Sequence, residues 1–147
     1  MDSPLQELYQ EIILEHNRHP RHAHAMDDAT HHAKGYNPNC GDDIQVFLRI
    51  QNDIIMDISF QGEGCAISKA SASLMTEKLC GQNIRDARQF SSDIQAALCD
   101  SGNSEFLRTQ GELAALEGVK KFPIRLKCAT LAWHAFDKTI ANEPQNE

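Results

Sequence analysis

Three cysteines and one aspartate stand in contexts that suit metal or sulfur chemistry: Cys40, Asp42, Cys65 and Cys128. Only Gly41 separates Cys40 from Asp42, and glycine permits a tight, left-handed backbone in which neighbouring side chains can turn to one point. Cys65 follows a Gly-Glu-Gly turn, and Cys128 follows an Arg-Leu-Lys stretch. We predict that these four side chains meet in space as one metal and sulfur site.

This set of donors restricts the choice of metal. Three thiolates and one carboxylate suit the four-coordinate, tetrahedral shell that zinc prefers. Thiolate also suits iron and iron–sulfur clusters, so the residues alone leave the metal open. The spacing is a weak signal, because 24 residues separate Cys40 from Cys65 and 62 separate Cys65 from Cys128, with no CxxC pair.

The alternative interpretation is that all five cysteines are small buried side chains, the common fate of a free cysteine. Context argues against this for three of them. Cys40 lies in a polar turn, Cys65 opens a predicted helix whose dipole favours thiolate, and basic residues precede Cys128. Cys80 and Cys99 close predicted helices among apolar residues, and we assign them no role.

Two other sets of residues could bind a metal instead of, or in addition to, these four. Asp43 could replace Asp42 as a ligand, although an acidic pair in a turn is usually solvated surface and Asp42 has the better reach from Cys40. Six histidines in the first third of the chain could also bind metal: His16, His19, His22, His24, His31 and His32. No pair of them has clean ligand spacing on a predicted element, so we interpret this segment as a solvated loop.

The elements that must position these residues begin with an amphipathic helix. Ser3 is a suitable N-cap, Pro4 suits the first helical position, and Gln6 can close a capping box. Apolar residues then repeat at helical spacing, at Leu5, Leu8, Tyr9, Ile12 and Ile13. We expect this helix to end before Pro20, and a loop to cover residues 18–32.

A small three-stranded antiparallel sheet is predicted next. A short strand is expected over residues 33–37, and alternating apolar residues predict strands over 44–50 and 54–60. Asn52-Asp53 signals the hairpin between the two longer strands. In the third strand the apolar set at alternate positions is Ile54, Met56, Ile58 and Phe60.

Helices are predicted for the remainder of the chain. They cover residues 66–79, a short segment from Asn83, residues 92–99, residues 105–117 and a last helix that begins at Pro123. The apolar stripe of that last helix is Leu126, Ala129, Trp133, Phe136 and Ile140. Cys128 lies about 120° from the stripe, so its side chain can reach a neighbouring loop. Strands and helices are segregated, which predicts an α+β fold.

Length and composition set further bounds. The 147 residues fit a single domain, residues 1–147, with a tail at 141–147 that we expect to be frayed. Five cysteines without a visible signal peptide favour thiol or metal chemistry in the cytoplasm over a disulfide framework. A net charge of −7 disfavours nucleic acid and anionic membranes as partners, and no apolar run approaches a membrane span.

Three blocks of the sequence resemble the signature blocks of the IscU/NifU-like iron–sulfur cluster assembly family. They are residues 40–42, 64–71 and 125–133, and residues 12–21 resemble the N-terminal block of that family. The chain is most similar to the SufU branch, since its segment between Cys65 and Cys128 is longer than in IscU scaffolds and Lys127 stands where those scaffolds carry histidine. Residues 118–123 replace the Pro-Pro-Val-Lys stretch that scaffolds offer to a chaperone.

The SufU resemblance implies a zinc-dependent sulfur acceptor with a sulfurtransferase-like activity. Zinc would be held by Cys40, Asp42, Cys65 and Cys128. A SufS-like cysteine desulfurase would pass persulfide sulfur to Cys40, freed when the partner supplies a replacement ligand, for relay to a downstream cluster-building scaffold. Two other classes stay open: an IscU-type scaffold that binds iron or an iron–sulfur cluster at the same cysteines, and a structural zinc-binding interaction module.

Overall fold

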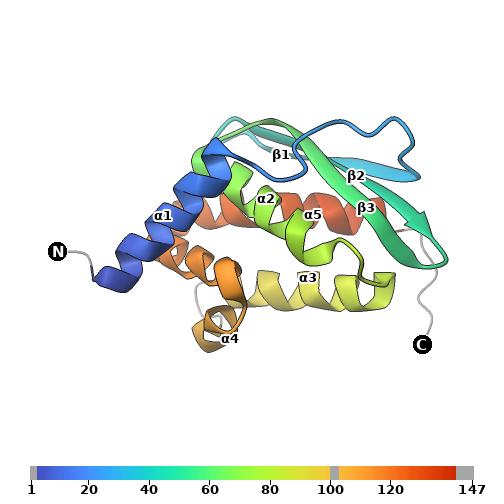
Figure 1. Cartoon of the computed structure of the whole chain (residues 1–147). Coiled ribbons are helices and arrows are strands. Elements are labelled where there is room, and N and C mark those ends of the chain that lie inside the picture. The colour runs from blue at the N-terminus through green and yellow to red at the C-terminus, as the bar shows by residue number, and fades with distance from the viewer. Residues whose placement is uncertain (1–2, 100–102, 142–147) are drawn as a thin grey trace.

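A three-stranded sheet lies over a layer of helices in the computed structural model, which describes residues 3–99 and 103–141 (Figure 1). The elements run in the order α1 (Pro4–Arg18), β1 (His31–Asn37), β2 (Asp42–Gln51), β3 (Ile54–Glu63), α2 (Ala66–Leu79), α3 (Ile84–Leu98), α4 (Ser104–Arg108), the 3-10 helices η1 (Gly111–Lys121) and η2 (Pro123–Arg125), and α5 (Leu126–Thr139). α5 packs on β1 and β2, α2 packs on β3, and α3 packs against α5. The predicted α+β class is confirmed. Of the predicted frayed tail, residues 142–147 lie outside the described residues.

The capping box predicted for α1 is present. The Gln6 amide donates to Ser3 Oγ at 3.1 Å, and the Ser3 amide donates to Gln6 Oε1 at 3.2 Å. Tyr9 is buried against η1, but Leu5 and Leu8 remain 50% and 54% exposed, so the predicted apolar stripe is only partly used. The reason is visible in Figure 1, where the first turns of α1 extend beyond the body of the protein.

The sheet has the order β1-β2-β3, and its hairpin is the predicted one, since Asn52 and Asp53 both adopt positive φ angles. The predicted alternation along β3 is wrong in its first half. The pairing shifts between Arg49 and Ile50, so that Met56 becomes an extra residue in the ladder. This β-bulge reverses the facing of the strand, which buries Ile55 and leaves Met56 exposed.

The segment between α1 and β1 is a loop tied to the sheet by backbone hydrogen bonds. The Phe60 amide donates to the carbonyl of His22 at 3.0 Å, and the Thr30 amide donates to the carbonyl of Leu48 at 2.8 Å. β1 begins at His31, two residues earlier than predicted. The solvated-loop interpretation is wrong for His16, which lies on α1 and is fully buried.

The central helices differ from the prediction in two places. The two short helices expected between residues 83 and 99 form one helix, α3, whose N-cap Asn83 accepts a hydrogen bond from the Asp86 amide. The helix expected over residues 105–117 is instead the short α4 followed by η1. Gly111, with a φ of +60°, begins η1, and this left-handed conformation is incompatible with a continuous α-helix.

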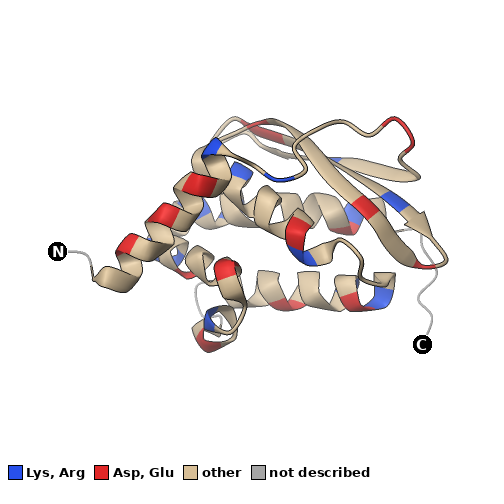
Figure 2. Cartoon of the chain, in the orientation of Figure 1, with Lys and Arg blue, Asp and Glu red and all other residues tan. Residues whose placement is uncertain are grey.

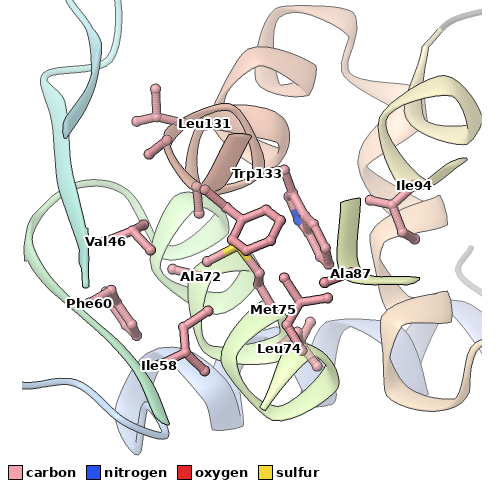
Figure 3. Close-up of a cluster of buried hydrophobic side chains, with 14 of the residues drawn as sticks. Val46, Ile58, Phe60, Ala72, Leu74, Met75, Ala87, Ile94, Leu131 and Trp133 are labelled. Atoms are coloured by element: carbon pink, nitrogen blue, oxygen red, sulfur yellow. The ribbon is translucent and has the colours of Figure 1, made fainter. Parts of the chain in front are cut away.

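The core lies between the sheet and the helices, mainly α2, α3 and α5 (Figure 3). Trp133 of α5 is at its centre, fully buried, with its indole Nε1 donating to Ser71 Oγ at 3.0 Å. Small side chains on α2, among them Ala70 and Ala72, leave room for this close packing. The predicted stripe of α5 is confirmed, since four of its residues are fully or almost fully buried and Leu126 packs against the core from the edge.

Acidic and basic residues are distributed along the helices, the strands and the loops (Figure 2). Acidic residues recur along α1, at Glu7, Glu11 and Glu15. Within residues 3–99 and 103–141, no helix has the length and apolar character required to cross a membrane.

Candidate metal centre

Cys40 and Asp42 are positioned by the loop that joins β1 to β2. Asn37 pairs with Asp42 at the end of the ladder, so residues 38–41 form a tight hairpin loop. The Cys40 amide donates to the carbonyl of Asn37 at 3.3 Å, and Gly41 has the predicted left-handed conformation, with a φ of +70°. The loop therefore holds the Cys40 side chain beside that of Asp42, the first residue of β2.

Cys128 reaches this loop from the first turn of α5. Its Sγ atom lies 3.1 Å from Cys40 Sγ, and the Asn37 side-chain amide donates to it at 3.6 Å. One donor atom each from Cys40, Asp42 and Cys128 lies within 4.8 Å of the other two. Cys128 has no exposed surface and Cys40 is half-buried, so the cluster opens to solvent on the side of the hairpin loop.

The two carboxylate oxygens of Asp42 have different surroundings. Oδ1 accepts hydrogen bonds from the Cys65 amide at 2.8 Å and from the Ser68 hydroxyl at 3.2 Å. Oδ2 is buried without a hydrogen-bond partner in the described part of the chain. A buried carboxylate oxygen without a partner is costly, and a cation would satisfy it. Two thiols and a carboxylate oxygen of Asp42 therefore fit a metal ion, whereas Asp43 is exposed to solvent.

Cys65 is adjacent to the cluster and interacts with the Cys128 thiol, but its sulfur is not in the group of donor atoms that all lie within 4.8 Å of one another. It is the N-cap residue of α2, directly after β3, and its Sγ lies 3.8 Å from Ser68 Oγ. Of the four predicted ligands, the structure thus brings three donor atoms together and places the fourth residue beside them through its amide. A ligand role for Cys65 stays a prediction.

The electrostatics of the cluster differ from the prediction at Cys128. Burial is the largest cause that raises the pKa of the Cys128 thiol far above its ordinary value, followed by the interactions with the neighbouring Cys40, Asp42 and Cys65. Burial therefore outweighs the flanking basic residues, and the expectation that they favour thiolate at Cys128 is wrong. Lys127 is exposed to solvent, so its charge is screened.

The guanidinium of Arg125 faces the sulfur atoms. Its Nη1 lies 3.6 Å from Cys40 Sγ. Hydrogen bonding with Cys128, and then the negative potential of Cys40 and Cys65, raise the pKa of Arg125. A cation at this position stabilises negative charge on the sulfur atoms. Sequence reasoning associated Arg125 with Cys128 and missed its contact with Cys40.

Ser68 is a second residue that sequence reasoning missed. It stands three residues after Cys65, on the same face of α2. This spacing is the sequence signal from which a contact of Ser68 with the site could have been predicted. The remaining cysteines do not join the cluster among the described residues: Cys80 is half-buried at the end of α2, and Cys99 is exposed.

His16 belongs to a separate junction of helices. Its Nδ1 lies 2.8 Å from Ser73 Oγ of α2, and its Nε2 lies 3.2 Å from Glu112 Oε1 of η1. Glu77 is 3.8 Å from the same nitrogen and also pairs with Arg21. This buried histidine therefore links α1 to α2 and η1. The donor atoms of His16, Glu77 and Glu112 also lie close enough together to hold a metal ion, although the two carboxylates are exposed. No other histidine in the described residues belongs to such a group.

Comparisons with known proteins identify the family of this chain. The family model for the NifU-like N terminal domain matches residues 8–142. The chain belongs to this family. It is 39% identical to the zinc-dependent sulfurtransferase SufU of Bacillus subtilis, over 95% of this chain and 93% of that protein. It is 37% identical to the iron-sulfur cluster assembly scaffold protein IscU of Streptococcus pyogenes, over 94% of this chain and 86% of that protein.

The NifU-like family assignment is also supported by solved structures. The chain superposes with a TM-score of 0.81 and 26% identity on a protein of Fervidobacterium islandicum described as a candidate iron-sulfur cluster assembly scaffold for the SUF system. That match covers 92% of this chain and 98% of the solved one. The predicted resemblance to the IscU/NifU-like family, with SufU among the relatives, is confirmed.

Proposed function

We propose that this chain is a zinc-dependent sulfur acceptor in iron–sulfur cluster assembly. It would take persulfide sulfur from a cysteine desulfurase onto Cys40 and relay it to a downstream cluster-building scaffold. The observation that carries the proposal is the convergence of donor atoms from Cys40, Asp42 and Cys128, one of whose residues, Asp42, has a buried oxygen with no hydrogen-bond partner among the described residues. The name of the Bacillus subtilis relative supports both the metal and the sulfur chemistry.

Cys40, Asp42, Cys65 and Cys128 are the residues that would hold zinc. When bound, zinc keeps its thiol ligands deprotonated and, because it has no redox chemistry, does not promote their oxidation. Cys40 is the best acceptor of the cluster. It lies in a hairpin loop with partial exposure, whereas Cys128 is fully buried in the first turn of a helix.

The transfer is a thiolate–persulfide exchange. The Cys40 thiolate attacks the outer sulfur of the desulfurase persulfide, the partner's sulfur–sulfur bond breaks, and the desulfurase cysteine leaves as a thiolate. One sulfur–sulfur bond is exchanged for another, so no external oxidant or reductant is needed. Arg125, 3.6 Å from Cys40 Sγ, stabilises negative charge on the sulfur as the exchange proceeds.

The test is a desulfurase assay with the zinc-loaded protein and free cysteine. We expect faster alanine release and, by mass spectrometry, one added sulfur on Cys40. Cys40→Ser should bind the desulfurase and fail to accelerate it, while Cys99→Ser, at an exposed cysteine outside the cluster, should behave as the unmodified protein. No acceleration by the zinc form would contradict the proposal.

The second function is an IscU-type scaffold, which the similarity to the Streptococcus pyogenes protein favours. The same cysteines could bind iron or an iron–sulfur cluster. Lys127 argues against it, because this residue is exposed and its ammonium group has no lone pair for a metal. A stable iron–sulfur chromophore after anaerobic reconstitution, together with no stimulation of the desulfurase, would identify the scaffold. A structural zinc module would show neither activity.

A further inference from the structure

We propose that Ser68 is a positioning residue which, together with the Cys65 amide, holds the Asp42 carboxylate so that only Oδ2 is free to bind a metal ion. The inference rests on the metal site of the proposed function. It adds a residue outside the predicted ligand set, and it assigns separate roles to the two oxygens of one carboxylate.

The first step is the occupancy of Oδ1. This oxygen accepts from the Cys65 amide at 2.8 Å and from the Ser68 hydroxyl at 3.2 Å. Asp42 and Ser68 both have no exposed surface, so water does not replace these donors. Two donors on one side of a carboxylate fix the rotation of the group about its Cβ–Cγ bond. Oδ2 is then directed away from them, and it is the oxygen left without a hydrogen-bond partner in the described residues.

The second step is that the backbone at Gly64 passes close to the hydrogen bond between Ser68 and Asp42. Gly64 has ordinary backbone angles, so no left-handed conformation requires glycine there. A Cβ atom at Gly64 would instead lie 2.3 Å from Ser68 Oγ and 2.8 Å from Asp42 Oδ1. Any side chain at position 64 would therefore displace the hydroxyl or the carboxylate. The absence of a side chain at Gly64 keeps the Ser68–Asp42 hydrogen bond in place.

The third step is that the Ser68 hydroxyl has an alternative acceptor. It has one proton and lies 3.0 Å from the carbonyl of Cys65 as well as 3.2 Å from Asp42 Oδ1. The charged carboxylate is the stronger acceptor when it is present. If the Asp42 carboxylate moves away, the hydroxyl can turn to the Cys65 carbonyl, so the buried Ser68 hydroxyl keeps an acceptor.

The consequence is that the site prefers a metal ion with a four-coordinate shell, to which Asp42 contributes one oxygen. A carboxylate can bind a metal through one oxygen or through both, and binding through both suits larger cations with many oxygen ligands such as Ca²⁺. Binding through one oxygen leaves a four-coordinate shell with the thiolates, as zinc prefers. With Oδ1 occupied by Ser68 and Cys65, Asp42 is restricted to one-oxygen binding.

The test measures zinc affinity by competition with a chromophoric chelator, and coordination geometry by the visible spectrum of the cobalt(II)-substituted protein. We expect Ser68→Ala to weaken zinc binding about 10-fold or more and to reduce the intense tetrahedral cobalt bands. Ser68→Thr, which keeps the hydroxyl, should restore both readouts. Gly64→Ala should resemble Ser68→Ala, because both disturb the same hydrogen bond.

Ser73→Ala is the matched control. Ser73 is also buried on α2, but its hydroxyl contacts His16 and the Arg21 amide instead of the metal site. It should lower the melting temperature and leave zinc affinity and the cobalt spectrum unchanged. Wild-type affinity and spectrum in Ser68→Ala, or equal losses in Ser73→Ala, would overturn the proposal. These readouts need no desulfurase, so a failure of the sulfur-acceptor proposal alone would leave them unchanged.

Discussion

The Sγ atoms of Cys40 and Cys128 lie 3.1 Å apart although 88 positions separate the two residues in the chain. The contact joins the loop between β1 and β2 to the first turn of α5, and both cysteines are free thiols. Two thiolates at this distance would repel each other, and a shared cation removes the repulsion. A metal ion bound by both sulfur atoms would allow both to be thiolates at this separation.

The first prediction concerns metal content. The protein purified without chelator should contain about one zinc per chain, because one cluster of thiol and carboxylate donors is present in the described residues. Replacing Cys40, Cys65 or Cys128 by serine should reduce the zinc content strongly, as measured by elemental analysis. Cys80→Ser and Cys99→Ser should retain it. An equal loss of zinc in either of those two variants would show that the ligand assignment is wrong.

The second prediction concerns removal of the metal. Chelation should lower the melting temperature while leaving a cooperative transition, since the core around Trp133 is independent of the metal site. Differential scanning calorimetry of the zinc-loaded and chelator-treated protein would measure both properties. A chain that is fully unfolded by chelator alone would refute an independent core.

The third prediction separates Asp42 from Asp43. Asp42→Ala removes the acceptor of the Cys65 amide and the Ser68 hydroxyl, which should cost about 1–3 kcal/mol of stability. The same variant should release zinc faster to a chelator, because a carboxylate ligand is lost. Asp43→Ala, at an exposed position, should stay within about 0.5 kcal/mol of the unmodified protein. Urea titration and stopped-flow zinc release measure these effects, and a larger change in Asp43→Ala would reverse the assignment.

The fourth prediction is a pH dependence of zinc binding. Burial, Cys40 and Asp42 raise the pKa of Cys128 in the metal-free protein, so zinc must displace a proton from this thiol. Zinc affinity should therefore increase as the pH rises from about 6 to about 8, with proton release detectable by calorimetry in buffers of different ionisation enthalpy.

The raised pKa also affects the metal-free fold. Because the folded pKa of Cys128 lies above the unfolded value, this group contributes stability that is fully present below the unfolded pKa. That contribution is lost as the pH rises above the unfolded value toward the folded one. The melting temperature of the chelated protein should therefore fall at alkaline pH, and Cys128→Ser should reduce that fall. A zinc affinity that does not change with pH would contradict the fourth prediction, and a melting temperature of the chelated protein that does not fall at alkaline pH would contradict this one.

Features encoded by short-range signals could be predicted from the sequence. The capping box of Ser3 and Gln6 and the turn at Asn52-Asp53 depend on a few consecutive residues, and both are present as expected. The bulge at Met56 could not be predicted, because it depends on how β3 pairs with β2. His16 was misinterpreted for a similar reason, since its burial is decided by the distant Ser73 and Glu112.

The candidate site could also be predicted only in part: the residues that lie in informative local contexts were identified, and the contacts between remote residues were not. Residue type and local context identified Cys40, Asp42 and Cys128, which the structure brings together. The orientation of their side chains could not be read from the sequence. The contact of Arg125 with Cys40 and the hydrogen bond of Ser68 to Asp42 both cross between elements that are remote in the chain. The raised pKa of Cys128 likewise depends on burial that only the assembled fold provides.

The position of Cys128 in the last helix has a consequence for the order of events during biosynthesis. Cys40, Asp42 and Cys65 leave the ribosome with the sheet and the start of α2, whereas Cys128 follows after the whole intervening helical region. A nascent chain can offer the early donors but lacks the sulfur that lies closest to Cys40. At the proposed zinc site, loading at full affinity would then wait until α5 has docked on β1 and β2, so that only a completely folded chain would hold zinc at full affinity.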